Sequence, residues 1–471
     1  MKMKSSSTRH VGEKRVLDFV ADSVAKIAFF VSAAAALWLF GAYSATRDLV
    51  PYPQIKLALT HARQVVNELR GVSAPQETWF FYRPAPPSAQ TARTYLPNDV
   101  SPGFTLTYGI GNDHKLDVRI VDSAGNDLHR WDMDIFALWP NFDHVPESRR
   151  PKSNPGGDIN GLVFMPNGDI IFNFEPAGLM RLDYCGDVVW RLPYFTHHSA
   201  YLDENGNIFV SARKYHEESL PGWPNLVPEI FEEMVLEVSP DGEIVDEISV
   251  FDLLKRNNLE GLLYASSTAL FGAEVKGDLL HLNDVETFPS NLPSGVFERG
   301  DIMISLRNKN TIIVFNQASR KIKYVYTGSV VWQHDPDFVS GDEISIFDNH
   351  SIARSLMNRK RRPENISSRI VTINARDNSM KVVFEGSKDI PFYTDIIGKQ
   401  QRLPNGNLLL TESRWGRMIE LTPDGRLAWE YNNILKSGVA KGSLGLLMDG
   451  QRLAPEIDRA ALDRFQSTCA R

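Results

Sequence analysis

Two distant segments of the chain repeat one pattern of turns and apolar runs. The first reads PNGDIIFNFEPAGLMRLDYCGDVVW from Pro166, and the second reads PNGNLLLTESRWGRMIELTPDGRLAWE from Pro404. In each segment a glycine turn precedes an apolar run, a further glycine separates this run from the next, and a second glycine turn leads to a tryptophan. Short apolar runs bounded by Asn-Gly and Asp-Gly turns are typical of antiparallel β-strands.

Related segments lie between these two. They begin at Asp203, Met234 and Gly300, and the first two form one unit with an insertion. A unit of a few short strands cannot bury both of its faces, whereas closing several units into a ring buries all of them. We therefore predict an all-β, six-bladed β-propeller over residues 104–433, with Trp190 and Trp429 at matching positions. The predicted blades are 104–150, 156–194, 196–250, 275–328, 330–388 and 394–432.

An apolar stretch near the N-terminus predicts a membrane anchor. Residues 27–45 read IAFFVSAAAALWLFGAYSA, 19 residues without a charge, and about 20 such residues cross a bilayer. Six basic residues precede the stretch and three lie in the 20 residues after it, so residues 1–26 are expected in the cytoplasm and the body in the periplasm. A cleaved signal peptide is the alternative. The long basic region and the poor cleavage motif AYSA favour an anchor in the inner membrane that stays attached.

The segments flanking the predicted propeller have a different composition. Residues 54–71 carry apolar side chains at helical spacing and predict a juxtamembrane helix, and residues 72–102 are rich in Pro, Ser and Thr, as linkers are. Together they make up a predicted region 46–103. We also expect helical insertions at residues 228–235 and 252–259, and a helical C-terminal tail over 434–471.

Charge and cysteine content exclude some classes of function. The 51 basic and 58 acidic residues give a net charge of −7, so the chain lacks the basic excess of nucleic-acid-binding proteins and no nucleic-acid partner is expected. The two cysteines, Cys185 and Cys469, belong to no CxxC pair, which argues against structural zinc and thioredoxin-like sites. Cys185 is interpreted as a packed thiol, with a bridge to Cys469 left open.

Polar residues recur at one position of several units. The innermost strand of each propeller blade lines the central channel, so residues at its start are expected to converge on a shared pocket. A histidine that occurs alone is more often a packed or surface residue, and we interpret His197 and His350 in this way. Recurrence at one position of several units favours a functional site instead. The recurring residues are Asn160 and His198, each eight residues before a turn glycine, His334, seven residues before Gly341, and His281, which opens HLNDVE.

Four segments resemble the arylsulfotransferase family. They read VVWQHDPDF, LLHLNDVE, DIMISLRNKNTIIVF and QRLPNGNLLLTES, and the resemblance extends over roughly residues 150–435. It implies a six-bladed propeller enzyme of the bacterial periplasm. Such an enzyme transfers a sulfuryl group from a phenolic sulfate ester to a phenol without the nucleotide donor PAPS. The implied partners are therefore a small aryl sulfate and a phenol, with no cofactor and no metal.

The resemblance also implies roles for individual residues. The sulfurylated histidine corresponds to His334 in the W-x-H context, and the H-x-N pair corresponds to His281 and Asn283. The arginine of S-x-R corresponds to Arg307, and a further histidine to His198. The implied catalytic residues are thus His334, His281, Arg307 and His198. Asn283 and, by its repeat position, Asn160 are expected to bind substrate.

These residue types suit an attack on sulfur. Neutral imidazole is a good nucleophile near pH 7 because its ordinary pKa is about 6.5, and fixed donors stabilise the charge that develops on oxygen. Asp335 and Asp337 follow His334 closely, and a carboxylate beside a sulfate is unfavourable at short range. We therefore expect these two carboxylates to point away from the substrate or to orient His334.

Two other classes of function stay open from the sequence. The propeller could be a docking subunit of a membrane complex, bound to a protein partner or to further copies of itself. Alternatively, His198, His281 and His334 could hold a transition metal in a hydrolase or lyase, although Arg307 would repel a cation. Convergence of the four residues on one pocket would favour an enzyme over a docking subunit.

Overall fold

The structure of the chain is a computed structural model that describes residues 7–47, 81–265, 274–350, 366–438 and 440–469. The chain divides into two compact units, Met1–Thr78 and Trp79–Arg471. In the first unit, helix α1 (Ser7–Arg47) contains Ser23–Ser44, a stretch of mean hydropathy 1.9 that is long enough to cross a membrane. A single membrane span and a signal sequence both fit this helix. The predicted juxtamembrane helix lies outside the described residues.

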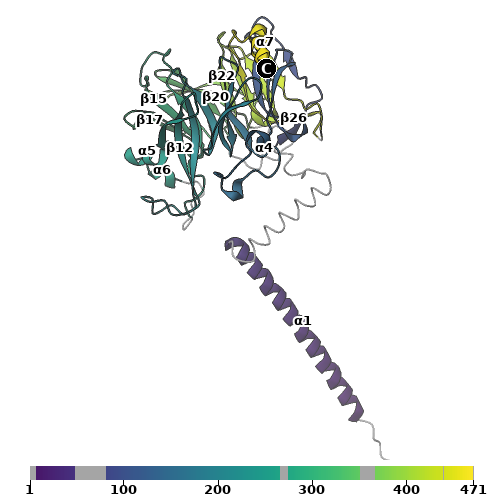
Figure 1. The fold of residues 1–471 in the computed structure, drawn as a ribbon. Coiled ribbons are helices and arrows are strands. Elements are labelled where there is room, and N and C mark those ends of the chain that lie inside the picture. Colours follow the sequence, from purple (N-terminus) through teal and green to yellow (C-terminus); the bar gives the residue numbers. More distant parts are fainter. Residues whose placement is uncertain (1–6, 48–80, 266–273, 351–365, 439, 470–471) are drawn as a thin grey trace, which may run out of the picture. The chain divides into compact units, whose positions relative to one another are not determined.

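The second unit is an all-β propeller of six blades, as predicted (Figure 1). Each blade is an antiparallel sheet whose strands follow one another from the channel outward. The second blade consists of β6 (Asp158–Phe164), β7 (Ile170–Glu175), β8 (Gly178–Leu182) and β9 (Val188–Leu192). The third consists of β10 (Thr196–Leu202), β11 (Ile208–His216), β12 (Ile230–Val238) and β13 (Ile244–Ser249).

The next three blades follow in chain order. The fourth consists of β14 (Leu282–Thr287), β15 (Asp301–Leu306), β16 (Thr311–Asn316) and β17 (Lys321–Thr327). The fifth consists of β18 (His334–Ser340), β19 (Glu343–Asp348), β20 (Arg369–Asn374) and β21 (Met380–Glu385). The sixth consists of β22 (Lys399–Arg402), β23 (Leu408–Glu412), β24 (Arg417–Leu421) and β25 (Leu427–Asn432).

The first blade closes the ring with strands from both ends of the propeller. Its inner strand is β27 (Leu447–Arg452), which pairs with β3 (Thr105–Ile110) and is followed outward by β4 (Leu116–Val121) and β5 (Asp127–Asp132). The expectation of a helical tail over 434–471 was therefore wrong for β26 (Ser443–Gly445) and β27, whereas α7 (Arg459–Thr468) is helical as expected. The run LMDGQR has no β-branched residue and acquires its strand conformation from pairing with β3. A Cβ on Gly450 would lie 1.7 Å from the Met418 sulfur of the sixth blade, so any larger residue here would have to displace the Met418 side chain.

The segment interpreted as a linker contributes two short strands. β1 (Tyr82–Pro84) pairs with β26 (Ser443–Gly445), and β2 (Ala92–Thr94) pairs with β25 as a fifth strand of the sixth blade. The prediction of a helix at residues 228–235 was also wrong, because these residues enter β12 and pair with β11 along its whole length. Helix α5 (Val250–Arg256) confirms the other predicted insertion.

The remaining helical elements are short and connect the sheets. They are α4 (Ile135–Leu138), α6 (Gly261–Tyr264), α7 (Arg459–Thr468) and the 3-10 turns at Asn112–His114, Glu147–Arg149, Arg307–Lys309 and Ser413–Trp415. α5 packs its buried residues against the outer strands β12 and β13, and its label lies beside β12 in Figure 1. None of these helices interrupts the inner strands.

The apolar core lies between the blades. The buried side chains form six clusters in the described part of the chain, and each cluster joins two neighbouring blades. The sequence repeat is visible in the pairing of the outer two strands of the second and sixth blades. Trp190 lies opposite Arg181 of β8, and Trp429 lies opposite Glu420 of β24, and each of these partners is the fourth residue of its five-residue strand. The prediction that these tryptophans occupy matching positions is confirmed.

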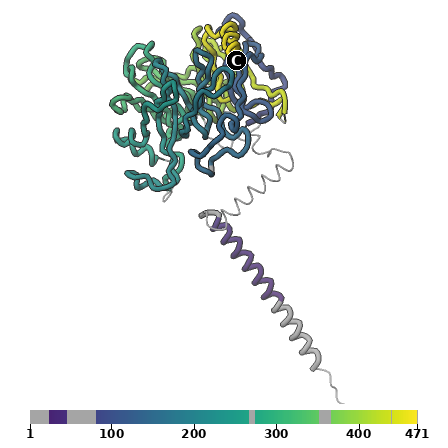
Figure 2. The backbone as a smooth tube through the Cα atoms, in the orientation of Figure 1, coloured from purple at the N-terminus to yellow at the C-terminus, as the bar shows by residue number. Residues whose placement is uncertain are grey.

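A disulfide joins Cys185 to Cys469. Cys185 lies in the turn between β8 and β9, and Cys469 follows α7, so the bond attaches the C-terminal helix to the second blade. Figure 2 shows the yellow C-terminal segment beside the blue strands of the first blades. The interpretation of Cys185 as a packed thiol was wrong, because the contact that decides it spans 284 residues of sequence.

We expect the double variant Cys185→Ser/Cys469→Ser to unfold more easily than the native protein. A disulfide that closes a long loop restricts the unfolded chain, and its loss typically costs about 2–4 kcal/mol of unfolding free energy. Thermal unfolding followed by circular dichroism, with and without a reductant, measures the effect. The reductant should lower the Tm of the native protein and leave that of the double variant unchanged. Equal Tm values for all four samples would contradict the prediction.

Candidate active site

The starts of the inner strands have irregular backbones. In five of the six blades the pairing between the first two strands shifts register near the start of the inner strand. Such bulges redirect side chains and are common beside active sites. His198, His281 and Trp332 have φ values of 56°, 56° and 55°, a left-handed conformation that costs a non-glycine residue about 1–2 kcal/mol. Interactions around these residues must therefore hold them in place.

The structure brings His198 and His281 into direct contact. Their Nε2 atoms are 3.0 Å apart, and the two rings meet edge to face with centroids separated by 4.6 Å. His198 belongs to β10 of the third blade, whereas His281 precedes β14 of the fourth. The Nδ1 atom of His281 is hydrogen-bonded to the carboxylate of Asp278. Two neighbouring blades thus supply one pair of imidazoles.

A buried histidine and a buried glutamate lie behind His198. The Nδ1 atoms of His197 and His198 are 2.8 Å apart, and Nε2 of His197 lies 2.9 Å from the Glu233 carboxylate. Neither His197 nor Glu233 has solvent-exposed surface. Glu233 lies on β12, opposite Arg213 of β11. His197, which sequence reasoning interpreted as a packed residue, therefore connects the site to the third strand of its blade.

Hydrogen bonds determine which ring nitrogen of His334 carries the proton. Nδ1 of His334 lies 2.9 Å from the Trp332 carbonyl and 2.7 Å from Oδ1 of Asn349. The amide nitrogen of Asn349 donates to the carbonyls of Thr394 and Ile397 at 3.0 and 2.8 Å, which fixes Oδ1 as the acceptor. Because both partners of Nδ1 are acceptors, Nδ1 must be the protonated nitrogen. Nε2 therefore has a lone pair, and it has no hydrogen-bond partner among the described residues.

Burial keeps the imidazoles of the site neutral. Burial, and then the charge of Arg307, lower the pKa of His334 to about 3. Burial likewise lowers the pKa of His281 to about 4 and that of His198 well below its usual value, and Arg307 contributes to both. The guanidinium of Arg307 lies over the Trp332 ring, 4.9 Å from its centroid. One arginine thus acts electrostatically on all three histidines.

The two predicted asparagines differ in their placement. The Asn283 amide donates to the carbonyl of Gln333 at 2.8 Å, so it joins the strand that follows His281 to the residue before His334. Its Oδ1 is buried without a hydrogen-bond partner. Asn160 is buried on β6, and no hydrogen bond between described residues connects it to the three histidines. Its expected role in substrate binding stays a prediction.

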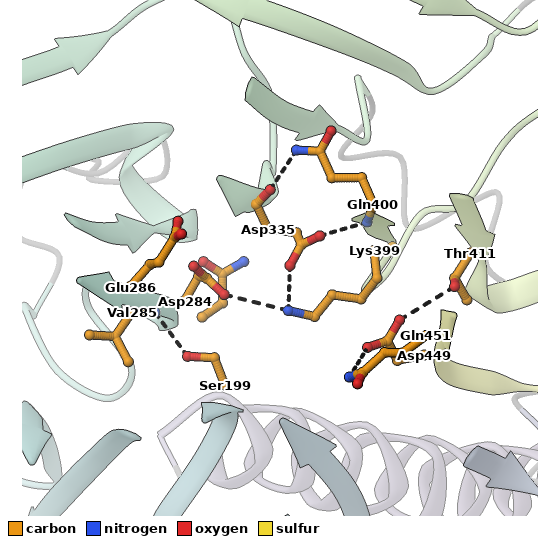
Figure 3. A network of polar contacts seen from close by, with 12 residues as sticks. Ser199, Asp284, Val285, Glu286, Asp335, Lys399, Gln400, Thr411, Asp449 and Gln451 are labelled. Carbon is orange, nitrogen blue, oxygen red and sulfur yellow. Dashed lines mark hydrogen bonds and ion pairs between the residues drawn. The ribbon is translucent and has the colours of Figure 1, made fainter. Parts of the chain in front are cut away.

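An acidic layer follows the histidines along the inner strands. Ser199, Asp284 and Asp335 directly follow His198, Asn283 and His334 in the sequence, and all three line a cavity of about 310 Å³. In Figure 3 the side chain of Lys399 extends between Asp335 and Asp284, with Nζ–carboxylate distances of 2.5 and 3.5 Å.

The contacts in this layer show where the carboxylate of Asp335, which follows His334, is directed. The Asp335 carboxylate accepts hydrogen bonds from Lys399 and from the backbone N–H of Gln400, the latter at 2.6 Å, so it is directed into this network. Burial raises the pKa of Asp284 to about 7 and that of Glu286 well above its usual value. The layer therefore holds less negative charge than its composition suggests. The Asp335 carboxylate thus contacts Lys399 and Gln400 rather than the His334 ring, and the expectation that it points away from the substrate stays a prediction.

The described residues offer no ligand set for a metal. No group of three or more His, Cys, Asp or Glu side chains in this part of the chain is arranged to hold a metal ion. His198 and His281 share a hydrogen bond through the very nitrogens that would bind a cation. The hypothesis of a metal held by His198, His281 and His334 thus has no geometric support.

A family model for arylsulfotransferase (ASST) matches residues 161–434. The chain belongs to the arylsulfotransferase family. The match covers blades two to six, and with them all of the histidines described above. It confirms the resemblance found from the sequence and supports an arylsulfotransferase-like activity. A search of curated proteins found no match to the chain.

Several solved structures align with the chain at low sequence identity. A protein of unknown function from Bacteroides caccae aligns over 74% of this chain and 98% of its own, with 12% identity and a TM-score of 0.44. TolB from Acinetobacter baumannii aligns over 74% and 67%, with 11% identity and a TM-score of 0.38. Virginiamycin B lyase from Staphylococcus aureus aligns over 58% and 69%, with 12% identity and a TM-score of 0.32. At these TM-scores the neighbours carry no information about the site.

Sequence reasoning missed several residues of the site. Asn349 was not singled out from the sequence, yet it is fully buried and its Oδ1 accepts a hydrogen bond from Nδ1 of His334. Asp278 lies three residues before His281, and this short spacing is a signal that could have been noticed. Glu233 gave no comparable signal, because its contact with His197 depends on the pairing of strands within the blade.

We expect His334 to remain neutral between about pH 5 and pH 8. Burial and the charge of Arg307 lower its pKa to about 3, so its ring should be protonated on Nδ1 alone throughout this range. Nitrogen chemical shifts of ¹⁵N-histidine-labelled protein measure both properties, and the His334→Asn variant assigns the signal. A titration near the ordinary value of about 6.5, or a proton on Nε2, would show that the hydrogen-bond assignment is wrong.

Proposed function

We propose that the protein is an arylsulfotransferase that transfers a sulfuryl group from an aryl sulfate to a phenol through a covalent intermediate on His334. The observation that carries this proposal is the state of the His334 ring. Its Nδ1 is held by two acceptors, and its neutral Nε2 has a lone pair. Because the aryl sulfate itself donates the sulfuryl group, the proposed reaction needs no nucleotide donor such as PAPS.

In the first half-reaction, Nε2 of His334 attacks the sulfur of the aryl sulfate. An N–S bond forms, the bond between sulfur and the phenolic oxygen breaks, and its electron pair leaves with the oxygen. The His334 ring acquires positive charge in this step. The Trp332 carbonyl and Asn349 Oδ1 stabilise that charge, since both accept a hydrogen bond from Nδ1.

The surrounding residues would stabilise the transferring group. Arg307 carries a permanent positive charge beside the three histidines, which suits the oxygens of a sulfuryl group. His281 and His198 are neutral, and their N–H groups already have acceptors: Nδ1 of His281 is bonded to Asp278, and the two Nε2 atoms share one proton. A sulfuryl or phenolic oxygen that replaces His281 as the acceptor of this shared proton would receive the N–H of His198. Asn283 is committed to the Gln333 carbonyl, so we assign it a positioning role between the strands of His281 and His334.

The second half-reaction reverses the first with a different phenol. The acceptor oxygen attacks sulfur, the N–S bond breaks, and His334 regains its lone pair. This sequence predicts ping-pong kinetics and a release of the first phenol before the second binds. Incubation with 4-nitrophenyl sulfate and a series of phenols tests it: parallel lines in double-reciprocal plots support the mechanism, and intersecting lines contradict it.

We also propose that the propeller lies in the periplasm and is anchored in the inner membrane by α1. The basic residues before the apolar stretch favour a cytoplasmic N-terminus. The disulfide between Cys185 and Cys469 is a second, independent argument, because such bonds persist in oxidising compartments and are rare in the cytosol. A propeller outside the cytoplasm would also have no access to PAPS.

We expect His334→Asn to abolish sulfuryl transfer and Arg307→Ala to slow it by about a hundred-fold or more, because one donor to a developing charge is worth about that factor. Turnover of 4-nitrophenyl sulfate with phenol as acceptor measures both. His216→Asn is the matched control, since His216 pairs with Glu232 outside the site, and it should retain native turnover. Near-native transfer by His334→Asn would rule out the covalent mechanism.

We expect the apolar helix to stay attached to the mature protein. Its length and the basic residues before it suit a permanent span. Protease added to spheroplasts should remove the propeller and leave a protected N-terminal fragment, and N-terminal sequencing of the native protein should find a residue before residue 27. A mature N-terminus beyond Ala42 would show that the helix is a cleaved signal peptide.

A further inference from the structure

Five side chains form one continuous hydrogen-bonded chain, which we call the histidine relay. It runs from Glu233 through His197 and His198 to His281 and Asp278. The contacts are Glu233 Oε2 to His197 Nε2 at 2.9 Å, His197 Nδ1 to His198 Nδ1 at 2.8 Å, His198 Nε2 to His281 Nε2 at 3.0 Å, and His281 Nδ1 to the Asp278 carboxylate. The relay thus begins on the buried third strand of the third blade, passes through two of the predicted catalytic histidines and ends at Asp278.

The relay contains one more proton than three neutral imidazoles and two ionised carboxylates would supply. Each of its four hydrogen bonds needs one proton between the two heavy atoms. Three neutral imidazoles supply only three, and two ionised carboxylates supply none. A fully bonded relay therefore contains one additional proton, either on a carboxyl group or on an imidazole.

The surroundings place this proton on Glu233. Burial raises the pKa of Glu233 to about 8, against the charge of Arg213, whereas burial lowers the pKa of His197 to about 3 and that of His198 and His281 as described above. His281 holds the pKa of Asp278 below its usual value against the effect of burial. Oε1 of Glu233 is buried without a hydrogen-bond partner, which costs less for a neutral acid than for a carboxylate.

The tautomers then follow along the whole relay. The Glu233 hydroxyl donates to Nε2 of His197, and Nδ1–H of His197 donates to Nδ1 of His198. Nε2–H of His198 donates to Nε2 of His281, and Nδ1–H of His281 donates to Asp278. Every nitrogen has one role, and a proton taken from His198 Nε2 can be replaced stepwise from Glu233.

We propose that Glu233 and His197 are the proton reservoir and the proton carrier of the transfer reaction, connected to the substrate through His198. This inference rests on the proposed sulfuryl transfer and extends it to residues that do not touch the substrate. Phenolate is a poor leaving group because the ordinary pKa of a phenol is about 10. A proton delivered as the S–O bond breaks removes this difficulty.

The protons balance over one catalytic cycle. In the first half-reaction the leaving oxygen replaces His281 Nε2 as the acceptor of the His198 Nε2–H group and takes this proton. His197 Nδ1 then protonates His198 Nδ1, and Glu233 protonates His197 Nε2. One phenol O–H bond forms, and Glu233 becomes a carboxylate near the positive charge of Arg213. In the second half-reaction the acceptor phenol loses its proton to His198 Nε2, and the same steps in reverse restore the Glu233 carboxyl group.

The variant Glu233→Gln tests the relay. Its amide can still donate a hydrogen bond to His197 Nε2 but cannot release a proton, so the geometry and the neutral charge are kept. The rate of sulfuryl adduct formation is measured by intact mass with two donors, phenyl sulfate and 4-nitrophenyl sulfate. Only the leaving group of 4-nitrophenyl sulfate needs little protonation. We expect adduct formation from phenyl sulfate to fall by about a hundred-fold or more, and that from 4-nitrophenyl sulfate to change by less than about threefold.

The neighbouring residue provides a matched control. Glu232 lies on the same strand as Glu233, but it pairs with His216 at 2.8 Å and does not belong to the relay. The variant Glu232→Gln should therefore form adducts from both donors at native rates. Tm values of both variants report whether folding is intact. Equal losses with the two donors in Glu233→Gln, or no loss with either, would overturn the relay while leaving sulfuryl transfer in place. No adduct on the native protein with either donor would overturn sulfuryl transfer itself, and the relay with it.

The pH dependence gives a second readout. Glu233 is protonated below its pKa of about 8. The charged and titratable groups that act on it are Arg213, Asp278, His281, Glu175 and the hydrogen-bonded His197. With phenyl sulfate the native rate should therefore fall as the pH rises through about 8, and this fall should be absent from Glu233→Gln. A fall that persists unchanged in the variant would contradict the assignment of the proton to Glu233.

Discussion

Closure of the ring by β27 is the constraint on which the site depends. The first blade is completed only when Leu447–Arg452 pairs with β3, a contact between the two ends of the propeller. This pairing fixes all six inner strands around one channel, so that the starts of β10, β14 and β18 face one another. The close approach of Gly450 to Met418 and the disulfide to Cys469 both act at this closure. Without it, the three sheets that carry His198, His281 and His334 would not be held around one channel.

Local backbone geometry then converts this convergence into chemistry. His198 and His281 are held in left-handed conformations, and their rings are buried, which makes them neutral. A buried polar group is costly unless it is hydrogen-bonded, and the partners seen here are specific. Asn349 orders the ring of His334, and Glu233 with Asp278 orders the other imidazoles. Hydrogen bonding thus determines which nitrogen is free to react.

The sequence was informative about features that repeat and uninformative about contacts that do not. The matching turns at Pro166 and Pro404 predicted the blades, and recurrence of polar residues before the turns pointed to His198, His281 and His334. By contrast, the closing strand LMDGQR has no strand signature of its own, and the apolar spacing at residues 228–235 fits a helix as well as a strand. Pairing with distant strands decided both. Glu233 and Asn349 escaped notice for the same reason, since each acts through a partner on another strand.

The central claim is that Nε2 of His334 carries the sulfuryl group between donor and acceptor. Peptide mapping of the native protein tests it most directly, after incubation with an aryl sulfate in the absence of acceptor and an alkaline quench that preserves a nitrogen–sulfur bond. The account predicts one sulfuryl group per chain, located on the peptide that contains His334 and lost when a phenol is added. A sulfuryl group on another residue, or phenol release without any modified peptide, would contradict it.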